Sequence, residues 1–142
     1  MMKKVLPIAL LFFMTNAHAE EQKCDNLDNA DQFQLTVCAG KSLKEADDEL
    51  NRVYRLVLAK FANDKVFIGK FKAAQRAWLV FRDAQLAALY SDTDPTITYG
   101  SSHLMCYANE KADLTMARTK QLREWLDDQV DGDICASSIT MH

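Results

Sequence analysis

The side chains best suited to chemistry are polar groups that recur on apolar helical stretches. Aspartates facing arginines are common in catalytic sites, where neighbouring charges shift pKa values. Beside core leucines, the same groups would instead pair with one another and fix helix register, because buried charges require partners. We favour this structural interpretation, assign no catalytic residue and do not expect an enzyme. The residues of the predicted polar network are Asp47, Asn51, Tyr54, Gln75, Arg82, Asp83, Thr115 and Arg118.

The sequence contains four cysteines, Cys24, Cys38, Cys106 and Cys135, all of which are disulfide candidates. Their spacing contains no CxxC pair or Cys/His cluster, so no metal site is expected. An even number suits a compartment that oxidises thiols. Cys38 and Cys106 should lie at the same end of a helical bundle, and Cys24 could join them there. Cys135 either pairs with Cys106, which requires a shortened or broken last helix, or meets Cys24, or stays unpaired.

The first 19 residues have the pattern of a secretory signal peptide. Two lysines precede an apolar run from Val5 to Met14, and Ala17-His18-Ala19 resembles a cleavage site. The run is about half as long as a membrane-spanning helix requires. We therefore expect residues 1–19 to be removed on export to the periplasm and residues 20–142 to form one domain without membrane insertion.

The negative net charge of the chain limits the classes of macromolecule that it is expected to bind. The formal net charge is -3, and it becomes -5 when the two lysines of the predicted signal are removed. An acidic domain is an improbable ligand for nucleic acid. It does permit a cationic protein partner, which would be attracted over about a Debye length.

Apolar residues at three- and four-residue spacing predict an all-α protein. The expected helices cover about residues 31–61, 64–90 and 102–128, and short connections favour a small antiparallel three-helix bundle. Gly40 lies between two capping-box patterns, so the first helix is expected to be kinked or split there.

The apolar sides of the last two predicted helices indicate the core. Phe71, Trp78, Phe81 and Leu89 follow helical spacing in the second helix, and Leu104 does so in the third. We interpret the three aromatic residues of this set as core rather than as a ligand cage.

Three strings, in order and flanked by cysteines, carry a family resemblance. DxxLNxxY begins at Asp47, QRAWLVFRD at Gln75 and TxxRxxxL at Thr115. With the signal peptide, they make the chain resemble the lysozyme inhibitor LprI-like N-terminal domain family of exported bacterial proteins, over roughly residues 24–125. The resemblance implies a small helical bundle and, by analogy with the member that names the family, lysozyme inhibition. Many members have a cysteine where this chain has Leu86, so their disulfide connectivity is not carried over.

These observations predict a periplasmic protein-binding domain without cofactors. Inhibition of a lysozyme-type muramidase is the leading hypothesis, and a structural or accessory envelope protein, such as an immunity or assembly factor, is the alternative. The polar segment 91–100, expected to be an irregular loop, is the first candidate contact, and the acidic tail is the second. A calcium loop starting at Asp127 is disfavoured because its twelfth position lacks glutamate. The candidate contact residues are Asp92, Asp94, Tyr99, Asp127, Asp128 and Asp131.

Overall fold

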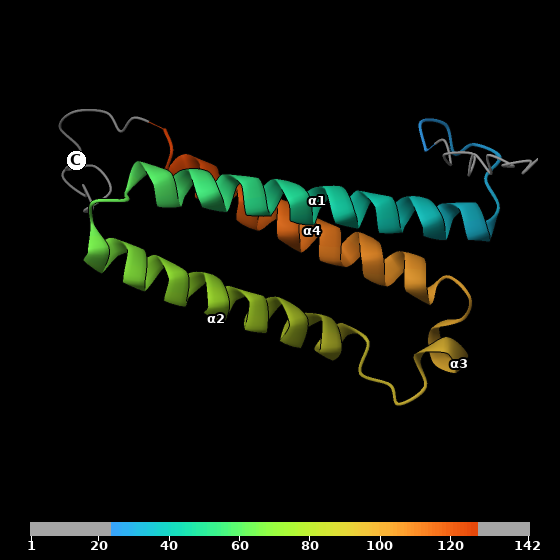
Figure 1. Cartoon of the computed structure of the whole chain (residues 1–142). Coiled ribbons are helices and arrows are strands. Elements are labelled where there is room, and N and C mark those ends of the chain that lie inside the picture. Colours follow the sequence, from blue (N-terminus) through green and yellow to red (C-terminus); the bar gives the residue numbers. More distant parts are fainter. Residues whose placement is uncertain (1–23, 128–142) are drawn as a thin grey trace, which may run out of the picture.

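The computed structural model of this chain describes residues 24–127. Within this range the chain forms three long helices and one short helix, and it contains no strand. The long helices run alternately up, down and up (Figure 1), which confirms the predicted antiparallel helical bundle. The elements are α1 (Gln32–Lys60), α2 (Lys65–Leu89), α3 (Pro95–Tyr99) and α4 (His103–Glu124).

Local side-chain caps determine where α1 and α2 begin. The carboxylate of Asp31 accepts a hydrogen bond from the backbone N–H of Gln34 at 2.8 Å, and the Gln34 side chain accepts one from the N–H of Asp31 at 3.2 Å. This is a complete capping box. Asp64 caps α2 in a simpler way, by accepting a hydrogen bond from the backbone N–H of Phe67 at 2.8 Å.

The expected split at Gly40 is wrong, because α1 is one helix of 29 residues that continues through this position. The adjacent Cys38 and Ala39 are buried, so tertiary packing holds this turn of the helix. A glycine inside a helix costs only about 1 kcal/mol relative to alanine, which such packing readily offsets.

The prediction of an irregular loop over residues 91–100 is also wrong, since this segment contains α3. Asp94 caps the short helix by accepting a hydrogen bond from the N–H of Ile97 at 3.2 Å. Pro95 occupies the first turn, where its restricted backbone is favourable. Gly100 ends the helix with a φ of 74°, a conformation that glycine adopts without strain.

The apolar core lies where α1 and α4 pack closely along each other, with α2 against them (Figure 1). Its buried members from the three long helices and the end of α1 are Leu50, Val53, Val57, Phe61, Phe71 and Leu122. Trp125 adds edge contacts, with its ring centroid 5.2 Å from that of Phe71.

Three residues predicted on apolar helix sides are not core. Phe81 is 59% exposed, Leu104 is 65% exposed and Leu89 is also exposed. Phe81 lies beside Arg82, which takes the inward position on that turn. Leu89 and Leu104 lie at the end of α2 and the start of α4, where no other helix covers them within the described chain. Phe71 is buried as predicted, and Trp78 is half-buried against the core.

One disulfide joins Cys24 to Cys38, with their Cα atoms 5.6 Å apart, and it ties the segment before α1 to the first turns of that helix. Cys106 is exposed and has a free thiol. Cys135, the predicted signal peptide and the candidate calcium loop beyond Asp127 lie outside the described residues.

Across residues 24–127, none of the helices combines the length and apolar character needed to cross a bilayer.

The core assignment predicts a contrast between two leucines of α4. Leu122→Ala should lower the free energy of unfolding by about 2–5 kcal/mol, because Leu122 is fully buried and its truncation leaves a cavity. Leu104→Ala should change it by less than about 0.5 kcal/mol. Urea unfolding followed by circular dichroism measures both values. Equal losses for the two variants would contradict this placement of the core.

Candidate functional site

A groove of about 420 Å³ lies between α1 and α2. Each helix lines it with residues three or four positions apart, which share one helical face. The lining residues are Asp47, Leu50, Asn51 and Tyr54 from α1, and Lys72, Gln75, Arg76, Leu79 and Arg82 from α2. Most of the predicted polar network therefore meets at this groove.

Arg82 forms the floor of the groove and connects three helices. Its Nη1 donates hydrogen bonds to Oδ1 of Asp47 and Oγ1 of Thr115, both at 3.1 Å. Its Nε donates to Oδ1 of Asp83 at 3.3 Å. Arg82 is only 7% exposed, so these partners compensate for removing its charge from water. The guanidinium thereby joins α1 and α4 to α2.

A second arginine, Arg118 of α4, contacts the groove residue Gln75 from outside the groove lining. The Nε of Arg118 donates a hydrogen bond to Oε1 of Gln75 at 3.1 Å, and burial lowers the pKa of Arg118. Both arginines lie close to the indole of Trp78, with the Arg82 and Arg118 guanidinium carbons 5.2 and 5.9 Å from its ring centroid. Cation–π attraction therefore adds to the hydrogen bonds that hold Arg82 and Arg118 in place.

The rim of the groove differs from its floor because three polar side chains there have no hydrogen-bond or ion-pair partner within the described residues. Within residues 24–127, the side chains of Asn51, Lys72 and Arg76 form no hydrogen bond or ion pair, and all three are exposed. Tyr54 stacks on Phe71 with ring centroids 5.0 Å apart. The floor is thus a rigid platform, and the rim can donate hydrogen bonds to a bound polar or anionic group.

The structure divides the eight predicted network residues into three sets. Asp47, Arg82, Asp83 and Thr115 form one connected network. Arg118 and Gln75 form a second contact, whereas Asn51 and Tyr54 line the groove. The sequence analysis missed Lys72 and Arg76, although their four-residue spacing on α2 would have placed them together.

Three of the six predicted partner contacts, Asp92, Asp94 and Tyr99, lie in or directly before α3. Oδ1 of Asp92 accepts a hydrogen bond from the backbone N–H of Asp94 at 3.0 Å, and this bond lowers the pKa of Asp92. Both aspartates are exposed, as is Asp127 after the end of α4. Asp128 and Asp131 lie outside the described residues. The acidic pair is therefore held in an ordered turn rather than in an irregular loop.

An aromatic cluster, which the sequence analysis did not identify, supports this turn. The ring centroid of Tyr90 lies 5.5 Å from that of Tyr99, 4.9 Å from that of His103 and 5.6 Å from that of Tyr107. Burial is the main cause that raises the pKa of Tyr90. His103 and Tyr107 are four residues apart on α4, which was the available sequence signal. The cluster anchors α3 to the ends of α2 and α4.

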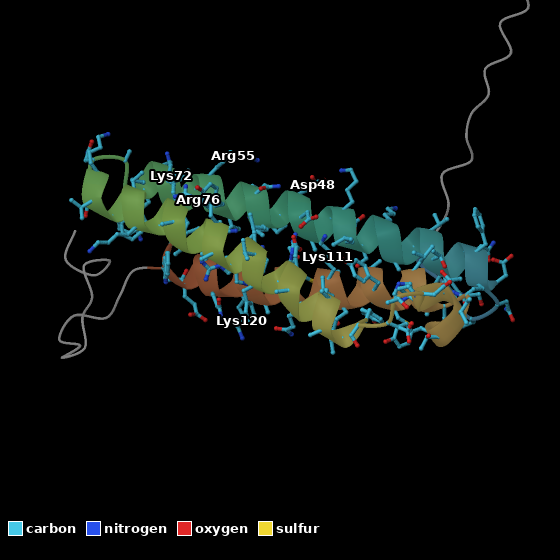
Figure 2. All side chains as sticks on the ribbon, turned by 90° about the horizontal axis from the view of Figure 1, so that it is seen from below. Asp48, Arg55, Lys72, Arg76, Lys111 and Lys120 are labelled. Carbon is cyan, nitrogen blue, oxygen red and sulfur yellow. A yellow bond between two sulfur atoms is a disulfide. The ribbon has the colours of Figure 1, made fainter. Side chains whose placement is uncertain are left out.

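Charge is strongly segregated along the bundle. Residues 50–82 contain eight basic side chains and one acidic one, whereas residues 24–40 and 83–110 together contain seven acidic and no Lys or Arg side chains. The turn between α1 and α2 lies at one end of the bundle, and α3 with the start of α1 lies at the other (Figure 1). Figure 2 shows Arg55, Lys72 and Arg76 in the basic part. The molecule therefore has one cationic and one anionic end.

The chain is similar to known proteins over most of its length. The family model described as lysozyme inhibitor LprI matches residues 24–122. An uncharacterized protein of Rhizobium meliloti (strain 1021) is 33% identical over 129 residues, covering 83% of this chain and 90% of the relative. No solved structure matches the chain.

The floor network predicts that Arg82 is a major stabilising residue. Arg82→Ala should lower the free energy of unfolding by about 3 kcal/mol, because it removes hydrogen bonds to charged and buried partners and the packing on Trp78. Arg55→Ala, an exposed arginine of α1, serves as the matched control and should cost less than about 0.5 kcal/mol. Urea unfolding measures both, and a similar small effect for the two variants would exclude the proposed role of Arg82.

Proposed function

Because the chain belongs to the lysozyme inhibitor LprI family, we propose that it is a periplasmic protein-binding domain that inhibits a lysozyme-type muramidase. The observation that carries the proposal is the family match, which spans residues 24–122 and so includes α1, α2, α3 and nearly all of α4. The disulfide between Cys24 and Cys38 supports export, because such bonds persist in oxidising compartments.

The anionic end of the bundle is the proposed contact surface for the enzyme. Asp92 and Asp94 are exposed there, and Tyr99 lies beside them on α3. A cationic enzyme would be drawn to this end by long-range attraction, which mainly increases the association rate. The capped helix and the aromatic cluster hold the surface in place before binding, which reduces the entropy lost on complex formation.

The groove supports a binding role more than a catalytic one. The buried Arg82 is engaged by three protein side chains, Asp47, Asp83 and Thr115. A general acid or base must reach the substrate proton that it transfers. Here the carboxylates nearest the groove are engaged with Arg82, and their interactions serve to hold the helices in register.

Titration of the purified protein against a cationic lysozyme-type muramidase tests this function. Clearing of a peptidoglycan suspension should slow in proportion to the protein added and stop near a stoichiometric ratio. The double variant Asp92→Asn/Asp94→Asn should reduce the association rate by about tenfold, because it removes two charges from the anionic end. Asparagine also caps helices, so α3 should remain folded.

The matched control is Asp113→Asn/Glu124→Gln, which removes two exposed charges from α4 away from α3 and should leave the association rate nearly unchanged. Full muramidase activity in the presence of a large excess of protein, with no measurable binding, would rule out the proposed inhibition. A periplasmic pull-down that recovers one stoichiometric partner other than a muramidase would favour the accessory envelope role instead.

A further inference from the structure

The outward side of α2 is apolar over about four helical turns. Val80 is 70% exposed and Phe81 is 59% exposed near its middle, and exposed alanines extend this face in both directions. A surface helix normally presents polar side chains to water, and a continuous exposed apolar surface marks an interaction site. The α2 face, as we call it, consists of Ala73, Ala77, Val80, Phe81, Ala84 and Ala87.

The charges beside the α2 face change sign along the helix. The half of α2 before the exposed Val80 contains Lys65, Lys70, Lys72 and Arg76 and no acidic residue. Beyond Val80, the first charged residue that is exposed is Asp83, and the turn after the helix adds two more aspartates. A second α2 lying antiparallel would therefore place its exposed Asp83 opposite the basic half of the first.

We propose that two copies of this chain associate through the α2 face, with antiparallel α2 helices related by a two-fold axis between residues 79 and 80. Arg76 then lies as far before the axis as Asp83 lies after it. These residues are seven positions apart, so they share one side of α2. The two-fold axis consequently brings Arg76 of each copy opposite Asp83 of the other copy, and two ion pairs flank the apolar contact.

Both members of this pair can accept the new contact. Arg76 has no ion pair within the described chain. The contacts of Asp83 with Arg82 and Lys111 both use Oδ1, which leaves Oδ2 available on an exposed carboxylate. The alanines allow two helix axes to approach to about 8–10 Å, where Val80 and Phe81 of the two copies would pack together. Because the interface is isologous, it closes at two copies.

The change of charge along α2 also favours a second copy of this chain, rather than the cationic enzyme, as the partner that covers the α2 face. A cationic surface laid along the α2 face would meet the like charges of Lys70, Lys72 and Arg76 over half its length. Like charges facing each other across an interface cost several kcal/mol and exclude such partners. A copy of the same helix in the opposite direction instead brings Asp83 opposite Arg76.

Sedimentation equilibrium of the purified chain over a wide concentration range tests the dimer. The unmodified chain should sediment as a dimer in equilibrium with monomer, and Phe81→Glu should sediment as a monomer because it buries an unpaired charge at the interface. Phe33→Glu is the matched control, because Phe33 is 72% exposed on α1, outside the α2 face, and this variant should remain dimeric. A monomeric unmodified chain, or equal behaviour of the two variants, would overturn the proposal.

Charge reversal tests the register of the two helices. Arg76→Glu and Asp83→Arg, each alone, should weaken the dimer by about tenfold or more, since each places two like-charged pairs across the axis. An equimolar mixture of the two variants should recover dimerisation, because both facing pairs become complementary in the heterodimer. A mixture no more dimeric than its components would exclude this register. If Asp83→Arg does not fold beside Arg82, as judged by circular dichroism, the comparison of Phe81→Glu with Phe33→Glu decides the proposal.

Discussion

The buried guanidinium of Arg82 is the interaction on which the arrangement of the three long helices depends. It reaches Asp47 on α1 and Thr115 on α4 from α2, at equal distances of 3.1 Å. A slip of one helix by a turn would remove the Asp47 or the Thr115 contact from this nearly buried charge, at a cost of several kcal/mol. Apolar packing alone discriminates poorly between such registers, since one leucine replaces another. The polar contact therefore gives the bundle a defined alignment.

This constraint explains the unequal packing of the helices. α1 buries six apolar residues, Cys38, Ala39, Ala46, Leu50, Val53 and Val57, whereas α2 buries only Phe71, Gln75, Arg82 and Leu86. Two of these four residues are polar, so specific hydrogen bonds position α2 where a broad apolar contact is lacking. Its inward side is consequently shaped into a groove with a fixed floor. Its outward side keeps apolar residues that the rest of the described chain does not cover.

The separation of charge gives the two ends of the bundle different capacities for recognition. The turn between α1 and α2 belongs to the basic segment 50–82, and the opposite end collects acidic side chains from 24–40 and 83–110. Opposite ends of an elongated bundle act nearly independently, because salt screens their fields beyond about 8 Å. One molecule can therefore attract a cationic protein at one end while the sides of α2 remain available for another contact.

Sequence alone determined the features that depend on neighbouring residues: the three long helices follow from apolar periodicity, and the capping box of Asp31 with Gln34 follows from three-residue spacing. Tertiary structure decided the rest, because it depends on contacts between residues distant in the chain. It placed Arg82 rather than Phe81 inside and chose Cys38 as the partner of Cys24. It also gathered Tyr90, Tyr99 and Tyr107 into the cluster that orders α3. Periodicity identifies the apolar side of a helix, but only the neighbouring helices establish how much of that side is covered.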